Sequence, residues 1–93
     1  MASPRAVYAQ ELRRRLRGLL ASVAAMLEAE HTLLLEEFID ANETVLALEC
    51  TVGYLAEGDR RVSADVLTEI DDLARTMGIS DAIRDERAQL LGG

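Results

Sequence analysis

Apolar residues recur at steps of three and four along most of this chain, and that spacing limits the fold more than any other feature. The clearest run lies near the N-terminus and consists of Tyr8, Leu12, Leu16, Leu19, Leu20, Val23 and Leu27. Residues with this spacing lie on one face of an α-helix. The only proline is Pro4, so no later proline interrupts a helix. Abundant alanine and leucine also favour helices over strands, and we predict an all-α fold.

A length of 93 residues supports one hydrophobic core, so we predict a single domain. Ser3 and Ser63 are suited to cap helices, because a serine side chain accepts a hydrogen bond from the first helical turn. Asn42 and Gly78 suit helix ends, because both residue types tolerate the left-handed conformation found there. These signals predict a small helical bundle of four main helices plus a short C-terminal helix. The expected helices span about residues 4–28, 32–41, 43–57, 64–77 and 81–91.

The helix expected over residues 43–57 has the broadest apolar face, formed by Val45, Ala47, Leu48, Cys50, Val52, Tyr54 and Leu55. A helix that is apolar over so much of its circumference packs on more than one side, so we expect it at the centre of the bundle. In the helix before it, the residues expected to face inward are Leu34, Leu35, Phe38 and Ile39.

Charge is distributed unevenly along the chain, whose net charge is −7. Residues 1–20 hold five arginines and one acid, whereas residues 21–59 hold nine acids and no basic residue. Such an acidic middle repels the phosphates of nucleic acids, so we expect no direct binding of nucleic acid. The same charge would attract a basic partner.

The chain carries no recognisable catalytic, metal-binding or cofactor-binding pattern. His31 is the only histidine and has no neighbouring cysteine or second histidine, so we interpret it as a residue at a helix end or on the surface. Cys50 is the only cysteine and is expected to be a small core residue in a reducing compartment. We therefore expect a protein that is not an enzyme and that holds no metal or cofactor.

The arginines of the first helix have three possible roles. They form a solvated face, they pair with the acids of the second and third helices, or they form a patch for phosphate or membrane. The run from Arg13 to Arg17, followed by an apolar stretch, also has the order of charge and apolar residues found in a signal peptide. However, the helical spacing continues through these arginines and no clear cleavage site follows. We therefore expect a cytoplasmic protein without a membrane span.

Acidic residues crowd the second and third helices around the expected corner at Asn42. The candidate partner-binding residues are Glu36, Glu37, Asp40, Glu43, Glu49 and Glu57. Like charges at helical spacing repel one another by a few tenths of a kcal/mol per pair, so their crowding favours a use in binding. The alternative interpretation is an acidic face that serves only solubility.

The same part of the chain resembles a known family. The residues that carry the resemblance lie between Leu34 and Ile79 and are Ile39-Asp40, Asn42-Glu43, Ala47-Leu48-Glu49, Leu55, Glu57, Leu73-Ala74 and Met77-Gly78-Ile79. In this pattern the chain is similar to the MafI-like immunity proteins of bacterial polymorphic toxin systems, in which an acid-rich corner joins two helices. Asn42 stands where that family favours glycine, and both residue types accept a left-handed conformation. The resemblance implies a protein that binds and neutralises a cognate toxin, often a nuclease.

These observations lead to two hypotheses for the function. The first is a bacterial immunity protein that covers a basic cleft of its cognate protein toxin with the acidic surface between Glu36 and Glu57. The alternative is a non-catalytic adaptor or homodimerisation module that uses the apolar stripe of the first helix. The alternative predicts a dimer that dissociates when Leu16 and Leu20 become charged.

Overall fold

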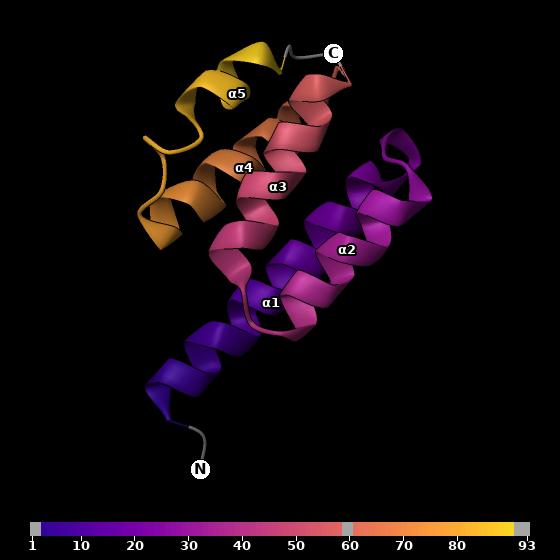
Figure 1. The fold of residues 1–93 in the computed structure, drawn as a ribbon. Helices are drawn as coiled ribbons and strands as arrows, with labels where there is room; N and C mark the ends of the chain where they lie inside the picture. The colour runs from indigo at the N-terminus through magenta and orange to yellow at the C-terminus, as the bar shows by residue number, and fades with distance from the viewer. Residues whose placement is uncertain (1–2, 59–60, 91–93) are drawn as a thin grey trace.

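The fold is a small all-α bundle, as the computed structural model shows for residues 3–58 and 61–90 (Figure 1). Its elements are α1 (Pro4–Val23), a 3-10 turn η1 (Ala24–Met26), α2 (Ala29–Asp40), α3 (Thr44–Glu57), α4 (Ala64–Met77) and α5 (Arg84–Gln89). Successive α-helices run in alternating directions, so each connection reverses the chain (Figure 1). The predicted fold class is therefore confirmed.

The local signals at helix starts act as the sequence predicts. The backbone N–H of Ala6 donates to the Ser3 hydroxyl at 3.1 Å, and that of Val66 donates to the Ser63 hydroxyl at 3.2 Å. Pro4 occupies the first helical position of α1, where its missing N–H costs no helical hydrogen bond. Each serine therefore satisfies one backbone donor that its helix leaves free.

Two helix ends share one hydrogen-bonding pattern. At the end of α2, Asn42 has a φ of 62°, and the N–H of Glu43 donates to the carbonyl of Phe38 at 2.8 Å. At the end of α4, Gly78 has a φ of 72°, and the N–H of Ile79 donates to the carbonyl of Ala74 at 2.9 Å. Both are Schellman endings, which place a left-handed residue after the helix. The corner predicted at Asn42 is thus confirmed.

The first connection differs from its prediction. We expected one helix over about residues 4–28 and a second from residue 32, but α1 ends at Val23 and α2 already begins at Ala29. Between them, η1 tightens the last turn, and Leu27 is extended with φ −111° and ψ 155°. This segment has no glycine or proline. The position of this break depends on how α2 folds back against α1. No residue within the segment predicts that packing.

The last helix is shorter than expected. We predicted it over about residues 81–91, and α5 covers only Arg84–Gln89. Residues 79–84 instead form turns in which the N–H of Ala82 and of Ile83 both donate to the carbonyl of Ile79. These turns bury Ile83 at the start of α5, and Leu90 is buried just after it. The predicted end at residue 91 lies outside the described residues.

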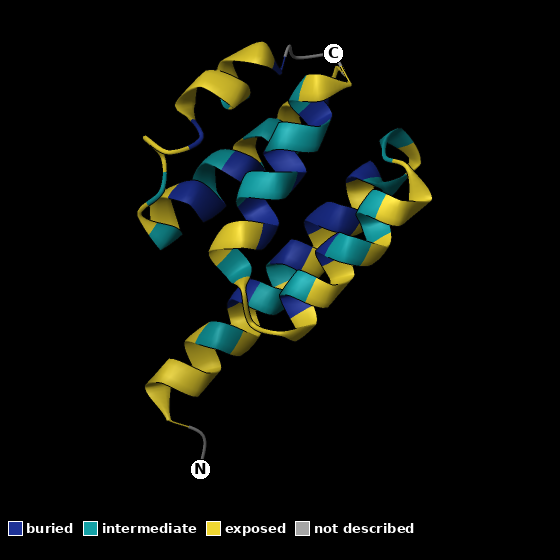
Figure 2. Cartoon of the chain, in the orientation of Figure 1, coloured by how far each residue is buried: buried dark blue, intermediate teal, exposed yellow. Residues whose placement is uncertain are grey.

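The hydrophobic core lies between the helices, with α3 at its centre (Figure 2). α3 packs against α1, α2, α4 and α5, as its broad apolar face predicts. The largest fully buried side chains are Leu16, Val23, Leu35, Ile39, Leu48, Val52, Leu55, Val62, Ile70 and Leu73. Burial of these apolar side chains is the main force that holds the bundle together.

The apolar faces are not buried along their full length. Tyr8 and Val45, which we expected in the core, keep 47% and 40% of their surface exposed. Tyr8 is exposed because the first two turns of α1 project past the end of the bundle (Figures 1 and 2), and Val45 lies in the first turn of α3. The Tyr8 hydroxyl still donates to the carbonyl of Thr76 at 3.2 Å, which ties this projection to the end of α4. Among the described residues, no helix combines the length and apolarity needed to cross a membrane.

Candidate protein-binding surface

Four of the six predicted binding residues lie together at the end of α2 and on the corner that follows. Glu36, Glu37, Asp40 and Glu43 are all exposed. We call this group the acidic corner. The first three extend from an ordered helix, and the Schellman ending at Asn42 holds Glu43 next to them. The backbone at the end of α2 therefore fixes where these four side chains begin.

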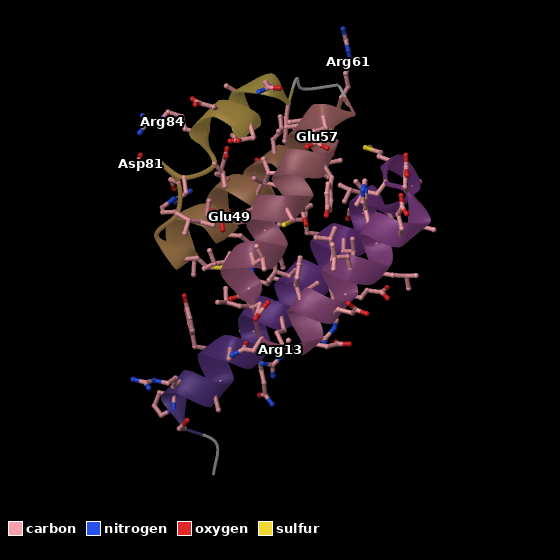
Figure 3. The ribbon with its side chains drawn as sticks, in the orientation of Figure 1. Arg13, Glu49, Glu57, Arg61, Asp81 and Arg84 are labelled. Carbon is pink, nitrogen blue, oxygen red and sulfur yellow. The ribbon has the colours of Figure 1, made fainter. Side chains whose placement is uncertain are left out.

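The other two predicted residues lie elsewhere. Glu49 is half-buried in the middle of α3, and Glu57 lies in its last turn (Figure 3). Since an α-helix rises about 1.5 Å per residue, Glu57 is about 20 Å along the helix axis from Glu43. The expected single surface from Glu36 to Glu57 is thus divided. This division follows from the length of α3 alone, and our sequence prediction of one continuous surface did not take it into account.

Arginines of α1 contact the acidic corner at two points. Arg17 donates to Asp40 at 2.8 Å, and Arg13 donates to the side-chain oxygen of Asn42 at 3.0 Å. This agrees with one of the three roles considered for these arginines, an internal counterpart to the acids. The Arg17 and Asp40 side chains keep 54% and 72% of their surface exposed. The pair is therefore well solvated and stabilises the fold by less than about 1 kcal/mol.

Two further α1 arginines, Arg14 and Arg15, pair away from the corner. Arg14 bonds to Glu11 within α1, and this hydrogen bond lowers the pKa of the Glu11 carboxyl. Arg15 donates to Glu69 of α4 at 2.8 Å. On α5, Arg87 holds both carboxylate oxygens of Asp71 at 2.8 and 3.0 Å, and this contact raises the pKa of the guanidinium. Ion pairs thus connect α1 to α4 and α4 to α5.

Most acids of α2 and α3 form no ion pair with a described residue. Of the ion pairs within residues 3–58 and 61–90, only Arg17–Asp40 involves an acid of these two helices or their connections. The acids of this region without an ion pair to a described residue are Glu28, Glu30, Glu36, Glu37, Glu43, Glu49 and Glu57. In contrast, α4, α5 and their connection place Glu69, Asp71, Asp72 and Asp81 in ion pairs. Within the described residues, acids without an ion pair are therefore more numerous in α2, α3 and their connections than in α4 and α5, where they are Asp65, Asp85 and Glu86.

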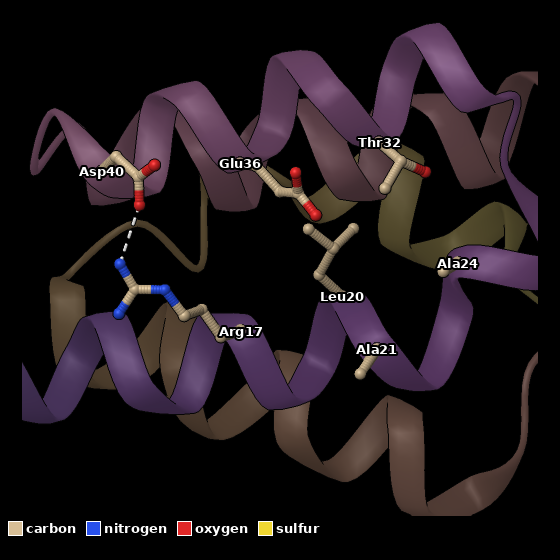
Figure 4. Close-up of a pocket in the computed structure, with 7 residues that line it drawn as sticks. All are labelled: Arg17, Leu20, Ala21, Ala24, Thr32, Glu36 and Asp40. Carbon is tan, nitrogen blue, oxygen red and sulfur yellow. Dashed lines mark hydrogen bonds and ion pairs between the residues drawn. The ribbon is translucent and has the colours of Figure 1, made fainter.

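A cavity of about 290 Å³ lies beside the acidic corner, between α1 and α2 (Figure 4). Its lining residues are Arg17, Leu20, Ala21, Ala24, Thr32, Glu36 and Asp40. We call it the α1–α2 cavity. The small side chains of Ala21 in α1 and Ala24 in η1 leave space opposite Thr32 and Glu36 of α2. Glu36 and Asp40 were predicted as binding residues, but this cavity was not predicted, since no pattern within either helix encodes it.

A second recess, of about 240 Å³, lies where α2 begins and α3 ends. There the rings of His31 and Tyr54 stack with centroids 3.9 Å apart and an angle of 5° between their planes. Glu28 and Glu57 also line this recess. Burial raises the pKa of the Tyr54 hydroxyl, and the nearby negative charges of Glu57 and Glu30 raise it further. The stack joins residues far apart in the sequence, so spacing alone did not reveal it.

The described residues contain no group of three or more histidine, cysteine, aspartate or glutamate side chains arranged to hold a metal ion. Cys50 is half-buried, and burial together with the charge of Glu49 raises the pKa of its thiol. A raised pKa disfavours the reactive thiolate. The chemistry available on this surface is therefore that of carboxylates, small apolar patches and one stacked aromatic pair.

Comparison with protein-family models, curated proteins and solved structures finds no match to this chain.

Proposed function

We propose that this chain is a non-catalytic binding protein that recognises a basic protein through the acidic corner. The observation that carries the proposal is the concentration, on α2 and its connection to α3, of carboxylates that form no ion pair with a described residue. Such a field accelerates encounter with a positively charged partner, by about 10- to 1000-fold at low salt. It also disfavours acidic proteins and nucleic acids as partners.

The more specific form of the proposal is a bacterial immunity protein that neutralises a cognate toxin. Its support is the sequence resemblance to the MafI-like immunity proteins, together with the acidic corner, two of whose residues, Asp40 and Glu43, belong to that resemblance. In this proposal the acidic corner covers a basic cleft of the toxin, such as the cleft with which a nuclease holds its substrate. Inhibition then follows from occlusion, and the chain itself needs no catalytic group.

The alternative of a homodimer through the stripe of the first helix needs a different interface. Leu16 and Leu20 keep only 2% and 5% of their surface exposed, because both pack in the core of a single chain. Charging them would unfold the bundle and would not report on a dimer. A second copy would have to contact the exposed Val7 and Tyr8 on the projecting turns.

The test compares two variants with equal changes in net charge. Glu37→Lys with Glu43→Lys reverses two charges of the acidic corner, whereas Asp85→Lys with Glu86→Lys reverses two exposed charges on α5. The partner is captured from lysate with the wild-type chain, identified, and purified for kinetic measurements at low and high salt. We expect the first variant to lower kon by about tenfold or more at low salt, and less at high salt.

The α5 variant should change kon by less than about threefold, since it alters total charge without touching the acidic corner. Thermal unfolding of each variant verifies that it is folded. Equal losses in both variants would mean that only overall charge matters, and no loss in either would remove the acidic corner as the binding site.

A further inference from the structure

We propose that the α1–α2 cavity binds the guanidinium group of an arginine side chain supplied by the basic partner. This inference rests on the proposed function, because it names the chemical group that the acidic surface would recognise. It goes further by separating Glu36 and Asp40, which line the cavity, from Glu37 and Glu43, which do not.

The shape of the cavity suits a long side chain with an apolar stem and a charged end. Leu20, Ala21 and Ala24 form an apolar wall, and the carboxylates of Glu36 and Asp40 lie along the α2 side (Figure 4). At about 290 Å³, the cavity is at the small end of the range for ligand sites, which fits a single side chain. Arginine commonly packs its methylene groups on apolar surface while its guanidinium bonds to carboxylates.

The charges of the cavity select a cation. Two carboxylates face one guanidinium, so the lining has an excess of negative charge. Glu36 has no ion pair with any residue in 3–58 or 61–90, and its carboxylate oxygens are directed toward the Leu20 side chain (Figure 4). An arginine is favoured over a lysine, because its planar group can bond to two carboxylate oxygens at once.

The protein already places one guanidinium at this site. Arg17 bonds to Asp40 at 2.8 Å at one end of the cavity. Because this pair is largely exposed, it contributes little to stability, and breaking it costs little free energy. Arg17 therefore acts as an internal competitor for the incoming guanidinium, and its removal would leave both carboxylates available.

The test uses N-acetyl-arginine amide as the probe in an NMR titration of the full chain. We expect saturable binding with a dissociation constant on the order of 10 mM, because a single partly solvated ion pair supplies the affinity. Backbone amide shifts should move in residues 17–24 and 32–40. N-acetyl-citrulline amide, which has the same shape without the charge, should produce no saturable shift.

Four variants test which residues bind the probe. Glu36→Gln should weaken binding by about three- to tenfold, whereas Glu37→Gln should change it by less than twofold, although both remove one charge from adjacent exposed positions. Arg17→Gln should tighten binding by about two- to fivefold. Arg14→Gln, whose partner is Glu11 and which lies outside the cavity, should leave binding within twofold.

Three results would overturn the inference. They are equal weakening by Glu36→Gln and Glu37→Gln, citrulline binding as strong as arginine binding, and shifts that map away from the α1–α2 cavity. Any of these would still leave the proposed function open, because the kinetic test there uses Glu37 and Glu43 and does not depend on this cavity. Conversely, arginine binding here with no effect of those two residues on kon would reject Glu37 and Glu43 as binding residues and leave the arginine site at Glu36 and Asp40 standing.

Discussion

The corner at Asn42 positions the acidic surface, and its replacement by alanine tests that interpretation most directly. Asn42 holds a φ of 62° at the end of α2 and accepts a hydrogen bond from Arg13 at 3.0 Å. Alanine at this position would keep the backbone N–H bonds of the Schellman ending but would place a Cβ in the left-handed region. It would also leave the Arg13 guanidinium without its acceptor.

The expected cost has two parts. A left-handed conformation costs an ordinary residue roughly 1–2 kcal/mol, and asparagine avoids part of that cost by local hydrogen bonding. Loss of an exposed hydrogen bond adds about 0.5 kcal/mol. Asn42→Ala should therefore lower the free energy of unfolding by about 1.5–2 kcal/mol. Asn42→Gly removes the steric cost but increases the freedom of the unfolded chain, and it should lose only about 0.5–1 kcal/mol.

Urea unfolding followed by circular dichroism measures these differences. Arg13→Met serves as the control, because it removes the hydrogen bond and keeps the backbone at Asn42 unchanged; it should lose about 0.5 kcal/mol. The reasoning is refuted if Asn42→Ala is as stable as the wild type. It is also refuted if Asn42→Gly loses as much as Asn42→Ala, since the left-handed backbone would then not be the cause.

Three further predictions concern other parts of the bundle. Ser63→Ala should lower the free energy of unfolding by about 1 kcal/mol through loss of the α4 cap, and urea unfolding measures it. Leu48→Ala should lower the free energy of unfolding by about 2–5 kcal/mol, because Leu48 is fully buried. Leu33→Ala, at a 62% exposed position, should change it by less than about 0.5 kcal/mol. Equal effects of the two substitutions would contradict the position of the hydrophobic core. Cys50 should react with a thiol reagent at pH 8 more slowly than a free cysteine, because its raised pKa leaves less thiolate at that pH. A reaction rate equal to that of the unfolded chain would contradict this prediction.

Local signals explain why much of the fold was predictable. Ser63, Asn42 and Gly78 each act within a few residues of the chain, through a cap or a left-handed backbone, so their roles follow from residue type and position. The break between α1 and α2 has no such residue. Its place depends on how α2 packs against α1, and our predicted boundary there was wrong by several residues.

The candidate site was predictable only in part for the same reason. The sequence shows that Glu36, Glu37, Asp40 and Glu43 are close along the chain. Helical spacing makes the first three neighbours on the surface, and the left-handed ending expected at Asn42 places Glu43 after them. It does not show that Arg17 reaches Asp40, or that small side chains of α1 leave a cavity beside Glu36. Those facts require the distance between two helices.

Residue order by itself determined the helical class, the two serine caps, the left-handed endings and the acidic character of α2 and α3, because each depends on interactions within one or two turns. Tertiary structure alone decided which carboxylates are neutralised, where the α1–α2 cavity opens, and that His31 stacks on Tyr54. These depend on contacts between helices, and the packing of the shared core sets the position of every such contact.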